Sequence, residues 1–513
     1  MRSLERFLQI DYICDMMNRI YLSMLAALLF LTFACKKDVL ITDSAATITL
    51  SADTITFDTI FTTIGSVTRV FKVYNPHNSE IEISSIYLAG GNSSNFRINV
   101  DGVKATEVKN VRIPKKDSLY VFVEVTLDPL NQNLPLIVKD SVVFITNGNE
   151  QDVKLIAFGQ DVHLINAEMI ETETWINDKP YLIYDWMGID SNNVLTIEEG
   201  VKIYLHNYSN IIVWGQINVQ GTRENPVIFE GDRFDQGYDR SAGRWSSIII
   251  LPGSTGNVID YAIIKNPTVG IQVGHYYYEG TTPELEIKNT VIQNAAAFGI
   301  YALNADILAY NTIIADCDVS AVALTMGGKY NFYHCTISNQ GAFYWAAGEG
   351  FYRGRSGPSV ILTNYFDYVT ADSTYNVITK YNTNDLIEAN FVNSIITGTK
   401  YTKNEVFAKE YEEEKFDFNF KFDHCIVKDV VDSVLEQYPG SFTNWMDSVY
   451  ARFVNDSLLN GDYDFMLDTL SPAKDAGDPS VFATHPFLRY DFNGNRRDDD
   501  DAPDLGAMER KED

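Results

Sequence analysis

A four-residue pattern that recurs through the second half of the chain constrains its fold more than any other feature. It begins as Tyr261-Ala262-Ile263-Ile264, and later copies start at Asn289, Asn311, His334, Asn393 and His424. Successive copies start 28, 22, 23, 59 and 31 residues apart. The shortest spacings match one turn of a solenoid, and the longer ones fit a turn with an insertion or two turns. The pattern predicts stacked β coils, and we expect the degenerate stretch 359–364 to supply a coil in the longest gap.

The residue type at each position of the repeat favours a parallel β-helix. The second residue is always small, and the fourth is always Ile or Val. Because strand side chains alternate faces, these two positions share one face, which we assign to the interior. The first residue, mostly Asn or His, can form a hydrogen-bonded ladder at the turn. Cys335 and Cys425 are then interior residues of one column, about three strands of ~4.8 Å apart and beyond disulfide reach.

Further stretches extend this architecture towards both ends. Residues 195–229 contain four short strands with abrupt turns, which we interpret as opening coils. Residues 470–507 resemble the last coils of bacterial pectate-lyase-like β-helix proteins. We therefore expect a right-handed parallel β-helix over residues 164–513, in which residues from about 457 to 513 cap the open end.

The preceding part of the chain has the pattern of an antiparallel sandwich. Within residues 49–163, short runs such as 67–74 and 118–125 alternate apolar and polar residues between turn signals. The strand Phe71-Lys72-Val73-Tyr74-Asn75 and the later Asn95-Phe96-Arg97-Ile98 resemble Ig-like domains of the abnormal-spindle/hydin type. That resemblance implies a spacer or docking module. The predicted fold class is therefore all-β, an Ig-like β-sandwich followed by a β-helix.

Residues 1–34 have the features of an export leader. After Arg19, an apolar run ends at Cys35, and it is shorter than the ~20 residues of a membrane-spanning helix. The run resembles a bacterial lipoprotein signal, which implies cleavage before Cys35 and acylation of that cysteine. Residues 35–48 would form the lipidated cysteine and a polar tether. We expect membrane attachment through this lipid anchor at the outer membrane, and the charged residues after Cys35 resemble signals for the cell surface.

Charge and cysteine content exclude several kinds of partner. The net charge is −29, and an acidic surface repels phosphate backbones, so we expect no nucleic acid partner. Beyond the leader and the acylated Cys35, only Cys317, Cys335 and Cys425 remain, an odd number without paired spacing. Neither a disulfide framework nor a zinc site is indicated. Together, leader, Ig-like domain and β-helix resemble a lipoprotein family across almost the whole mature chain.

The catalytic signatures of β-helix enzymes are absent or incomplete. Polygalacturonase-type hydrolases need paired carboxylates, but strands 289–291 and 311–313 have apolar residues where the acid would be. Lyases of this fold use calcium held by acids beside a Lys or Arg base, and the best candidate is loop 232–240 with Arg244 beyond it. Acids and arginines on such a loop more often pair with one another, so we expect no catalytic residues.

One C-terminal stretch has the spacing of a calcium loop. Asp491, Asn493 and Asn495 alternate as oxygen ligands would. The glycine falls at the fourth position of the loop instead of the sixth, and no distal Glu follows. We predict a structural turn and no cofactor, with a structural calcium ion as the alternative.

Aromatic residues gather where the repeat is interrupted. The candidate ligand-binding residues are Tyr276, Tyr277 and Tyr278 in one insertion and Tyr344, Trp345, Tyr352, Arg353 and Arg355 in another. Exposed rings stack on sugar faces, and insertions on a solenoid tend to collect on one side, where binding occurs. The alternative is that the rings form a satellite core against the flank.

Three functions fit these features. The first is a non-catalytic envelope lipoprotein that binds a polysaccharide or a partner protein along the β-helix. The second is a divergent polysaccharide lyase or glycoside hydrolase, and the third is a structural envelope component or adhesin. Fold alone does not confer activity, and the missing catalytic motifs favour the first and third.

Overall fold

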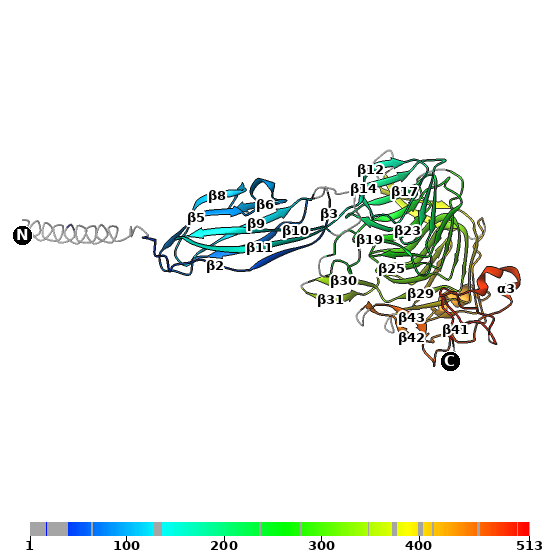
Figure 1. Ribbon diagram of the computed structural model, residues 1–513. Helices are drawn as coiled ribbons and strands as arrows, with labels where there is room; N and C mark the ends of the chain where they lie inside the picture. The colour runs from blue at the N-terminus through cyan, green and yellow to red at the C-terminus, as the bar shows by residue number, and fades with distance from the viewer. Residues whose placement is uncertain are drawn as a thin grey trace, which may run out of the picture. The chain divides into compact units, whose positions relative to one another are not determined.

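The protein is all-β, as predicted, with 54% of its residues in strands and 4% in helices. It divides into two compact units, one of Met1–Asp128 and Pro135–Gly159 and one of Pro129–Leu134 and Gln160–Asp513. No helix among the described residues is long and apolar enough to cross a membrane. The computed structural model (Figure 1) describes residues 17, 39–62, 65–127, 136–234, 237–277, 280–346, 348–371, 377–398, 404–412, 415–458, 462–499 and 501–511.

The first unit is a sandwich of two sheets that share one core. Alternation is clear in β9, where Leu119, Val121, Val123 and Val125 are buried and the residues between them are not. These side chains join residues of the opposite sheet, such as Phe144, in a single cluster. One sheet has the order β1 (Leu40–Ile41), β5 (Glu80–Leu88), β10 (Leu136–Thr146), β11 (Asn149–Gln160) and β3 (Thr54–Phe61), with β8 (Glu107–Ile113) also on β5. The other has the order β2 (Thr49–Leu50), β4 (Arg69–Tyr74), β9 (Ser118–Val125), β6 (Phe96–Val100) and β7 (Val103–Ala105).

The second unit is a parallel β-helix, in which most coils contribute one strand to each of three sheets (Figure 1). The first sheet stacks β13 (Glu173–Trp175), β15 (Val194–Glu198), β18 (Gln216–Gln220), β21 (Asn257–Asp260), β24 (Glu284–Lys288), the second halves of β26 (Phe298–Tyr310) and β28 (Ser320–Tyr333), β35 (Leu386–Val392), β38 (Lys421–Asp423) and β40 (Phe442–Thr443). The second sheet stacks β16 (Lys202–Leu205), β19 (Val227–Gly231), β22 (Ala262–Lys265), β25 (Val291–Ala295), β27 (Ile313–Cys317), β29 (Thr336–Asn339), β36 (Ile395–Gly398), β39 (Ile426–Val427) and β41 (Met446–Asp447). The third sheet stacks β17 (Asn210–Val213), β20 (Ser247–Ile250), β23 (Val269–Val273), the first halves of β26 and β28, β32 (Val360–Thr363) and β37 (Val406–Lys409). Both the second and the third sheet begin with β12 (His163–Ile170), which is followed in each by β14 (Tyr181–Ile189).

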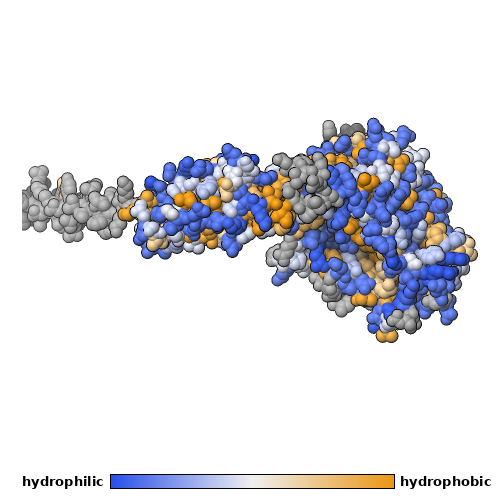
Figure 2. Space-filling view, viewed as in Figure 1, coloured by the Kyte–Doolittle hydropathy of each residue, from blue (hydrophilic) through white to orange (hydrophobic). Residues whose placement is uncertain are grey.

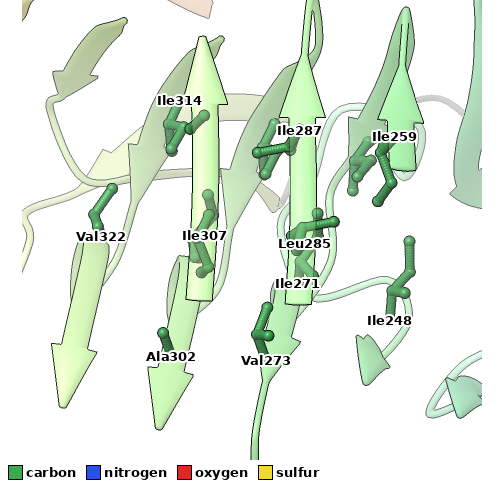
Figure 3. Packing of buried hydrophobic residues seen from close by; sticks show 14 of the residues in the cluster. Ile248, Ile259, Ile271, Val273, Leu285, Ile287, Ala302, Ile307, Ile314 and Val322 are labelled. Carbon is green, nitrogen blue, oxygen red and sulfur yellow. The ribbon is translucent and has the colours of Figure 1, made fainter. Parts of the chain in front are cut away.

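The interior is a set of side-chain columns that follow the strand register. Leu285 and Ile307, like Val273 and Ala302, occupy matching positions of neighbouring strands (Figure 3). Towards the C-terminal coils one column becomes a stack of phenylalanine rings, with centroids 4.7 to 5.0 Å apart and planes within 12° of parallel. Offset stacking of this kind adds to the burial of each ring. The stack consists of Phe332, Phe391, Phe422 and Phe442.

The inward assignment of the repeat is confirmed. Every second-position and fourth-position residue of the repeat is buried, and the three cysteines of the β-helix are buried free thiols. Each first-position residue has a φ between 46° and 51°, a left-handed conformation that Asn adopts more easily than most residues. The predicted ladder is present in part, because Asn311 donates to Asn289 over 3.1 Å and Asn289 donates to Asp260 over 2.9 Å.

The longest gap in the repeat does not contain an extra coil. Strand β36 pairs directly with β29, so the 59 residues are one turn with two inserted hairpins. One hairpin is β30 (Ala342–Ala346) with β31 (Glu349–Arg353), and the other is β33 (Tyr365–Ala371) with β34 (Val377–Thr383). The stretch 359–364, expected to supply a coil, instead provides β32 of the same turn.

The C-terminal residues lie along the side of the coils, which differs from the predicted cap over the open end. Asn311 donates to the Tyr490 carbonyl over 2.8 Å, Asn393 donates to the Asp478 carbonyl over 3.0 Å, and Arg223 donates to the Asn493 carbonyl. The segment therefore spans many coils on the ladder side. At the last coil, side chains next to the short helix α2 (Asp432–Gln437) pack against the interior, and Trp445 contacts Phe442 with centroids 5.1 Å apart.

Candidate functional site

The outer face of the third sheet carries a row of mostly apolar side chains. In a sheet with one solvated face, outward positions are normally polar, so this row needs an explanation. Most of its members alternate with buried residues, as Ile212 does between Ile211 and Val213, and Phe407 is 37% exposed, whereas Ala323 in the middle of the row is 1% exposed. In register across seven strands the row consists of Ile212, Ile249, Gln272, Tyr301, Ala323, Ile361 and Phe407.

Insertions flank this face at both edges. Between the second and third sheets lie the 232–246 loop and the β30–β31 hairpin, which stands out from the coils in Figure 1. The two insertions touch each other, because the Ala242 amide donates to the Phe343 carbonyl over 3.0 Å and the Trp345 amide donates to Ser241 Oγ over 3.3 Å. Between the third and first sheets lie the 274–283 loop and the β33–β34 hairpin. The aromatic insertions thus lie at opposite edges of one face.

A hollow of about 290 Å³ opens at the first of these edges. Two guanidinium groups cover one ring there, since Arg233 and Arg244 place Cζ 3.7 and 4.7 Å from the Tyr238 centroid. The Asp232 carboxylate lies 2.6 Å from Nδ1 of His206. The hollow is lined by Asn207, Tyr208, Gly231, Asp232, Arg233, Tyr238, Gly243 and Arg244.

Arg244 is built into this hollow. A Cβ on Gly231 would lie 2.7 Å from that of Arg244, so glycine makes room for the arginine. Burial lowers the pKa of the Arg244 guanidinium, and the neighbouring charge of Arg233 lowers that pKa further. Its described hydrogen bonds go to Ser241 Oγ and the Ala242 carbonyl, both at least 3.2 Å away. Among the residues that the structure describes, no carboxylate forms an ion pair with Arg244.

A second ladder, which the sequence interpretation missed, holds this edge in place. Asn266 and Asn294 are buried with left-handed φ values of 57° and 58°. Asn294 donates to Asn266 over 2.7 Å, and Asn266 donates to the Asp239 carbonyl over 2.7 Å. The Asn294 amide oxygen accepts from Phe343 N over 2.6 Å. Asp316 takes the same place in the next coil. All three residues are the sixth of their repeat copy, so a polar residue recurring at that position could have predicted this ladder.

Asp316 joins the hairpin and the C-terminal segment to this ladder. Its carboxylate accepts hydrogen bonds from the hydroxyls of Tyr352 and Tyr463, each over 2.5 Å, and from Gln340 N over 3.0 Å. Burial raises the pKa of the Asp316 carboxyl to about 7, although these hydrogen bonds oppose the rise. Because the group is fully buried, its role is to position other segments.

The predicted ligand-binding residues of the hairpin have different roles. Tyr344 is partly exposed, with the Arg353 guanidinium 5.9 Å from its ring, while Trp345 packs against the backbone of Gly237. Tyr352 donates to Asp316, as described above. Arg353 is exposed and pairs with Asp318 over 3.2 Å.

Arg355, in contrast, lies in the interior. Its guanidinium is paired with the Glu405 carboxylate over 2.5 Å, and the two side chains are 1% and 0% exposed. Arg355 therefore stabilises the turn beneath the hairpin and is not available to a ligand.

At the other edge the rings form stacks with one another. Tyr276 lies on Phe366, with centroids 4.9 Å apart, whereas Tyr277 is 77% exposed. Tyr381 and Tyr411 stack with centroids 4.4 Å apart. They border a hollow of about 410 Å³ that is also lined by lysines. The predicted residues Tyr278 and Cys35 lie outside the described residues.

The stretch predicted as a structural turn or calcium loop is closed by its own hydrogen bonds. The Asp491 carboxylate accepts from Asn495 N over 2.6 Å, from Glu509 N over 2.7 Å and from the Asn495 amide over 3.2 Å. The Asn493 carbonyl accepts from Arg223. Within the described ranges, no three acidic, His or Cys side chains cluster as metal ligands would.

Comparisons with known proteins add only distant likenesses. No protein-family model and no curated protein matches the chain. A family 123 glycoside hydrolase from Clostridium perfringens, studied for glycolipid glycan hydrolysis, is 8% identical over 25% of this chain and 30% of its own, with a TM-score of 0.17. PapD-like domain 7 of human CEP192 is 12% identical over 26% of this chain and 93% of its own, with a TM-score of 0.17. The catalytic unit of an α-1,3-glucanase of family GH87 from Streptomyces thermodiastaticus is 11% identical over 70% of this chain and 79% of its own, with a TM-score of 0.19.

Proposed function

We propose that this protein is a lipid-anchored envelope protein that binds an extended polysaccharide along the outer face of the third sheet. The observation that carries the proposal is the in-register row from Ile212 to Phe407, flanked at both edges by aromatic insertions. Rings and aliphatic side chains suit the apolar faces of sugars, and a few polar groups at the edges would fix the orientation. From β17 to β37 the face spans six strand spacings, or ~29 Å. That length suits a chain of several sugar units.

The anchor belongs to the same proposal. The leader that ends at Cys35 would place the β-helix at the outer membrane or the cell surface, where polysaccharides are accessible. Substituting Cys35→Ala should abolish labelling with a radioactive fatty acid and release the protein from the membrane fraction. Unchanged labelling would contradict the anchor without affecting the binding face.

Binding is the first candidate activity, and elimination is the second. A base of the lyase type is an Arg or Lys with a lowered pKa, and Arg244 has this property beside Asp232 and His206. Binding without cleavage and lyase-type elimination differ in their products. Incubation with acidic polysaccharides, with and without added calcium, should leave the chain length unchanged if the protein only binds. Unsaturated products would establish the lyase instead.

Affinity electrophoresis in gels that contain single soluble polysaccharides tests the binding face. We expect at least one polysaccharide to retard the protein and Tyr301→Ala to reduce that retardation. Tyr490→Ala is the matched control, because Tyr490 is 53% exposed on the C-terminal segment, outside the face. Equal loss in both variants, or no retardation by any polysaccharide across neutral and acidic classes, would overturn the proposal. Melting temperatures of both variants separate lost binding from lost folding.

A further inference from the structure

The hollow at the edge between the second and third sheets combines features that rarely occur together without a ligand. Two positively charged groups, Arg233 and Arg244, lie over the ring of one tyrosine, Tyr238, in a protein whose net charge is −29. Like charges at such short range repel, and a half-buried guanidinium usually has a carboxylate partner. Asp232, which also lines the hollow, lies against His206 and forms no described ion pair with Arg244.

Other arginines of the β-helix show the usual arrangement. Arg355 pairs with Glu405 and Arg497 pairs with Glu509, over 2.5 and 3.2 Å respectively. Arg244, in contrast, lies over the Tyr238 ring and donates to a hydroxyl and a carbonyl of its own turn, and no described carboxylate pairs with it. Its charge is therefore directed to the hollow without a described counter-charge.

We infer that the ligand of the proposed face carries a negatively charged group, a carboxylate or a sulfate ester, which Arg244 and Arg233 bind above Tyr238. The inference rests on the proposed function and specifies the class of polysaccharide. A guanidinium presents parallel N–H donors that match the two oxygens of such a group, and the centroid of the Tyr238 ring lies 3.7 and 4.7 Å from the Cζ atoms of the two arginines. The position of the hollow beside β17 and β20 puts this contact at the N-terminal end of the row.

Paired polysaccharides test the charge directly. Each acidic polysaccharide is compared with its own neutral form, made by carboxyl reduction for uronic acids or by desulfation for sulfate esters. These two arms show which group is recognised. We expect an acidic form to bind about tenfold tighter than its neutral form, which corresponds to one or two charged hydrogen bonds, and to weaken as salt rises.

Three variants complete the test. Arg244→Gln should abolish the preference for the acidic form, and Arg244→Lys should restore only part of it because the bidentate geometry is lost. Arg489→Gln removes the same charge from an exposed site on the C-terminal segment and should leave the preference unchanged.

The outcomes separate the two proposals. Equal binding of acidic and neutral forms would overturn the inference while the polysaccharide face stands. Loss of preference in Arg489→Gln as well would show a general charge effect and would also overturn it. Failure of every polysaccharide to bind would overturn both proposals.

Discussion

The hydroxyl of Tyr352 donates to the Asp316 carboxylate over 2.5 Å, and this bond fastens the β30–β31 hairpin to the coils. Tyr463, which precedes β43 (Asp464–Leu467), donates to the same carboxylate. Asp316 occupies the ladder position that Asn266 and Asn294 hold in the two preceding coils. One buried acid therefore joins a coil, an insertion and the C-terminal segment.

This arrangement predicts a pH dependence of stability. The pKa of Asp316 is raised in the folded state, from 3.8 to about 7. The folding stability that the neutral carboxyl contributes is therefore fully present below pH ~3.8 and is lost as pH rises through about 7. Asp316→Asn stays neutral and fits the ladder, so its stability relative to the wild type should increase from pH 4 to pH 8. A rise of about three pKa units corresponds to about 4 kcal/mol. Urea unfolding at several pH values measures the difference, and parallel pH profiles would contradict the prediction.

The interior columns predict that a charge inside the coil is not tolerated. Ile314 is fully buried in the main cluster, so Ile314→Asp should unfold the β-helix by burying an unpaired carboxylate. Val369→Asp is the control, because Val369 is 69% exposed on β33. Circular dichroism melts should show a large loss for the first variant and almost none for the second. A melting temperature near that of the wild type for Ile314→Asp would mean that this position does not face the interior.

The buried ion pair under the hairpin predicts a strong coupling. Arg355→Met leaves the Glu405 carboxylate buried without its counter-charge and should cost about 3–5 kcal/mol of unfolding free energy. The double variant Arg355→Met/Glu405→Leu should recover most of that loss. An exposed pair provides the comparison: Arg112→Met next to Glu82 should change the unfolding free energy far less, because solvent screens that pair. Additive losses in the double variant would show that the two charges are not coupled.

Tyr344 and Trp345 are neighbours in sequence but should respond differently to substitution. Tyr344→Ala should weaken polysaccharide binding, with a loss per ring on the scale of the ~1–3 kcal/mol known for base stacking, at an unchanged melting temperature. Trp345→Ala removes the ring that packs against Gly237, so it should loosen the 237–242 loop. Hydrogen exchange of that loop together with binding distinguishes the two effects. If Tyr344→Ala lowers the melting temperature instead, its ring belongs to the core.

The part of the fold that follows from local alternation could be predicted from the sequence. Thr312, just before β27, and Ile314, within β27, are two residues apart, and their small and β-branched side chains indicated the buried face correctly. Neighbouring coils bury the same kind of side chain at the equivalent position, so assigning the buried face of one strand correctly predicts the whole interior column. The aromatic insertions could be located for the same reason, because they interrupt the repeat.

Contacts between segments distant in the chain could not be predicted in this way. The third position of the repeat faces outward, yet Ile313 and Ile395 are buried because C-terminal residues such as Phe465 and Leu505 cover them. The apolar residue at each of these outward positions was the one sequence feature that could have indicated that another segment covers them. The burial of Arg355 depends on Glu405, fifty residues later, and no local pattern indicates such a partner.

The lengthwise course of the C-terminal segment has a consequence for folding. A solenoid whose repeats contact only their neighbours can fray from either end one unit at a time. Here the final residues connect coils that are far apart in the stack, from Arg223 to Asn393. Loss of one coil would therefore release contacts on several others, which makes the array unfold as one cooperative unit. The same long-range closure raises the contact order, so the β-helix should complete its folding slowly and only after synthesis of its last residues.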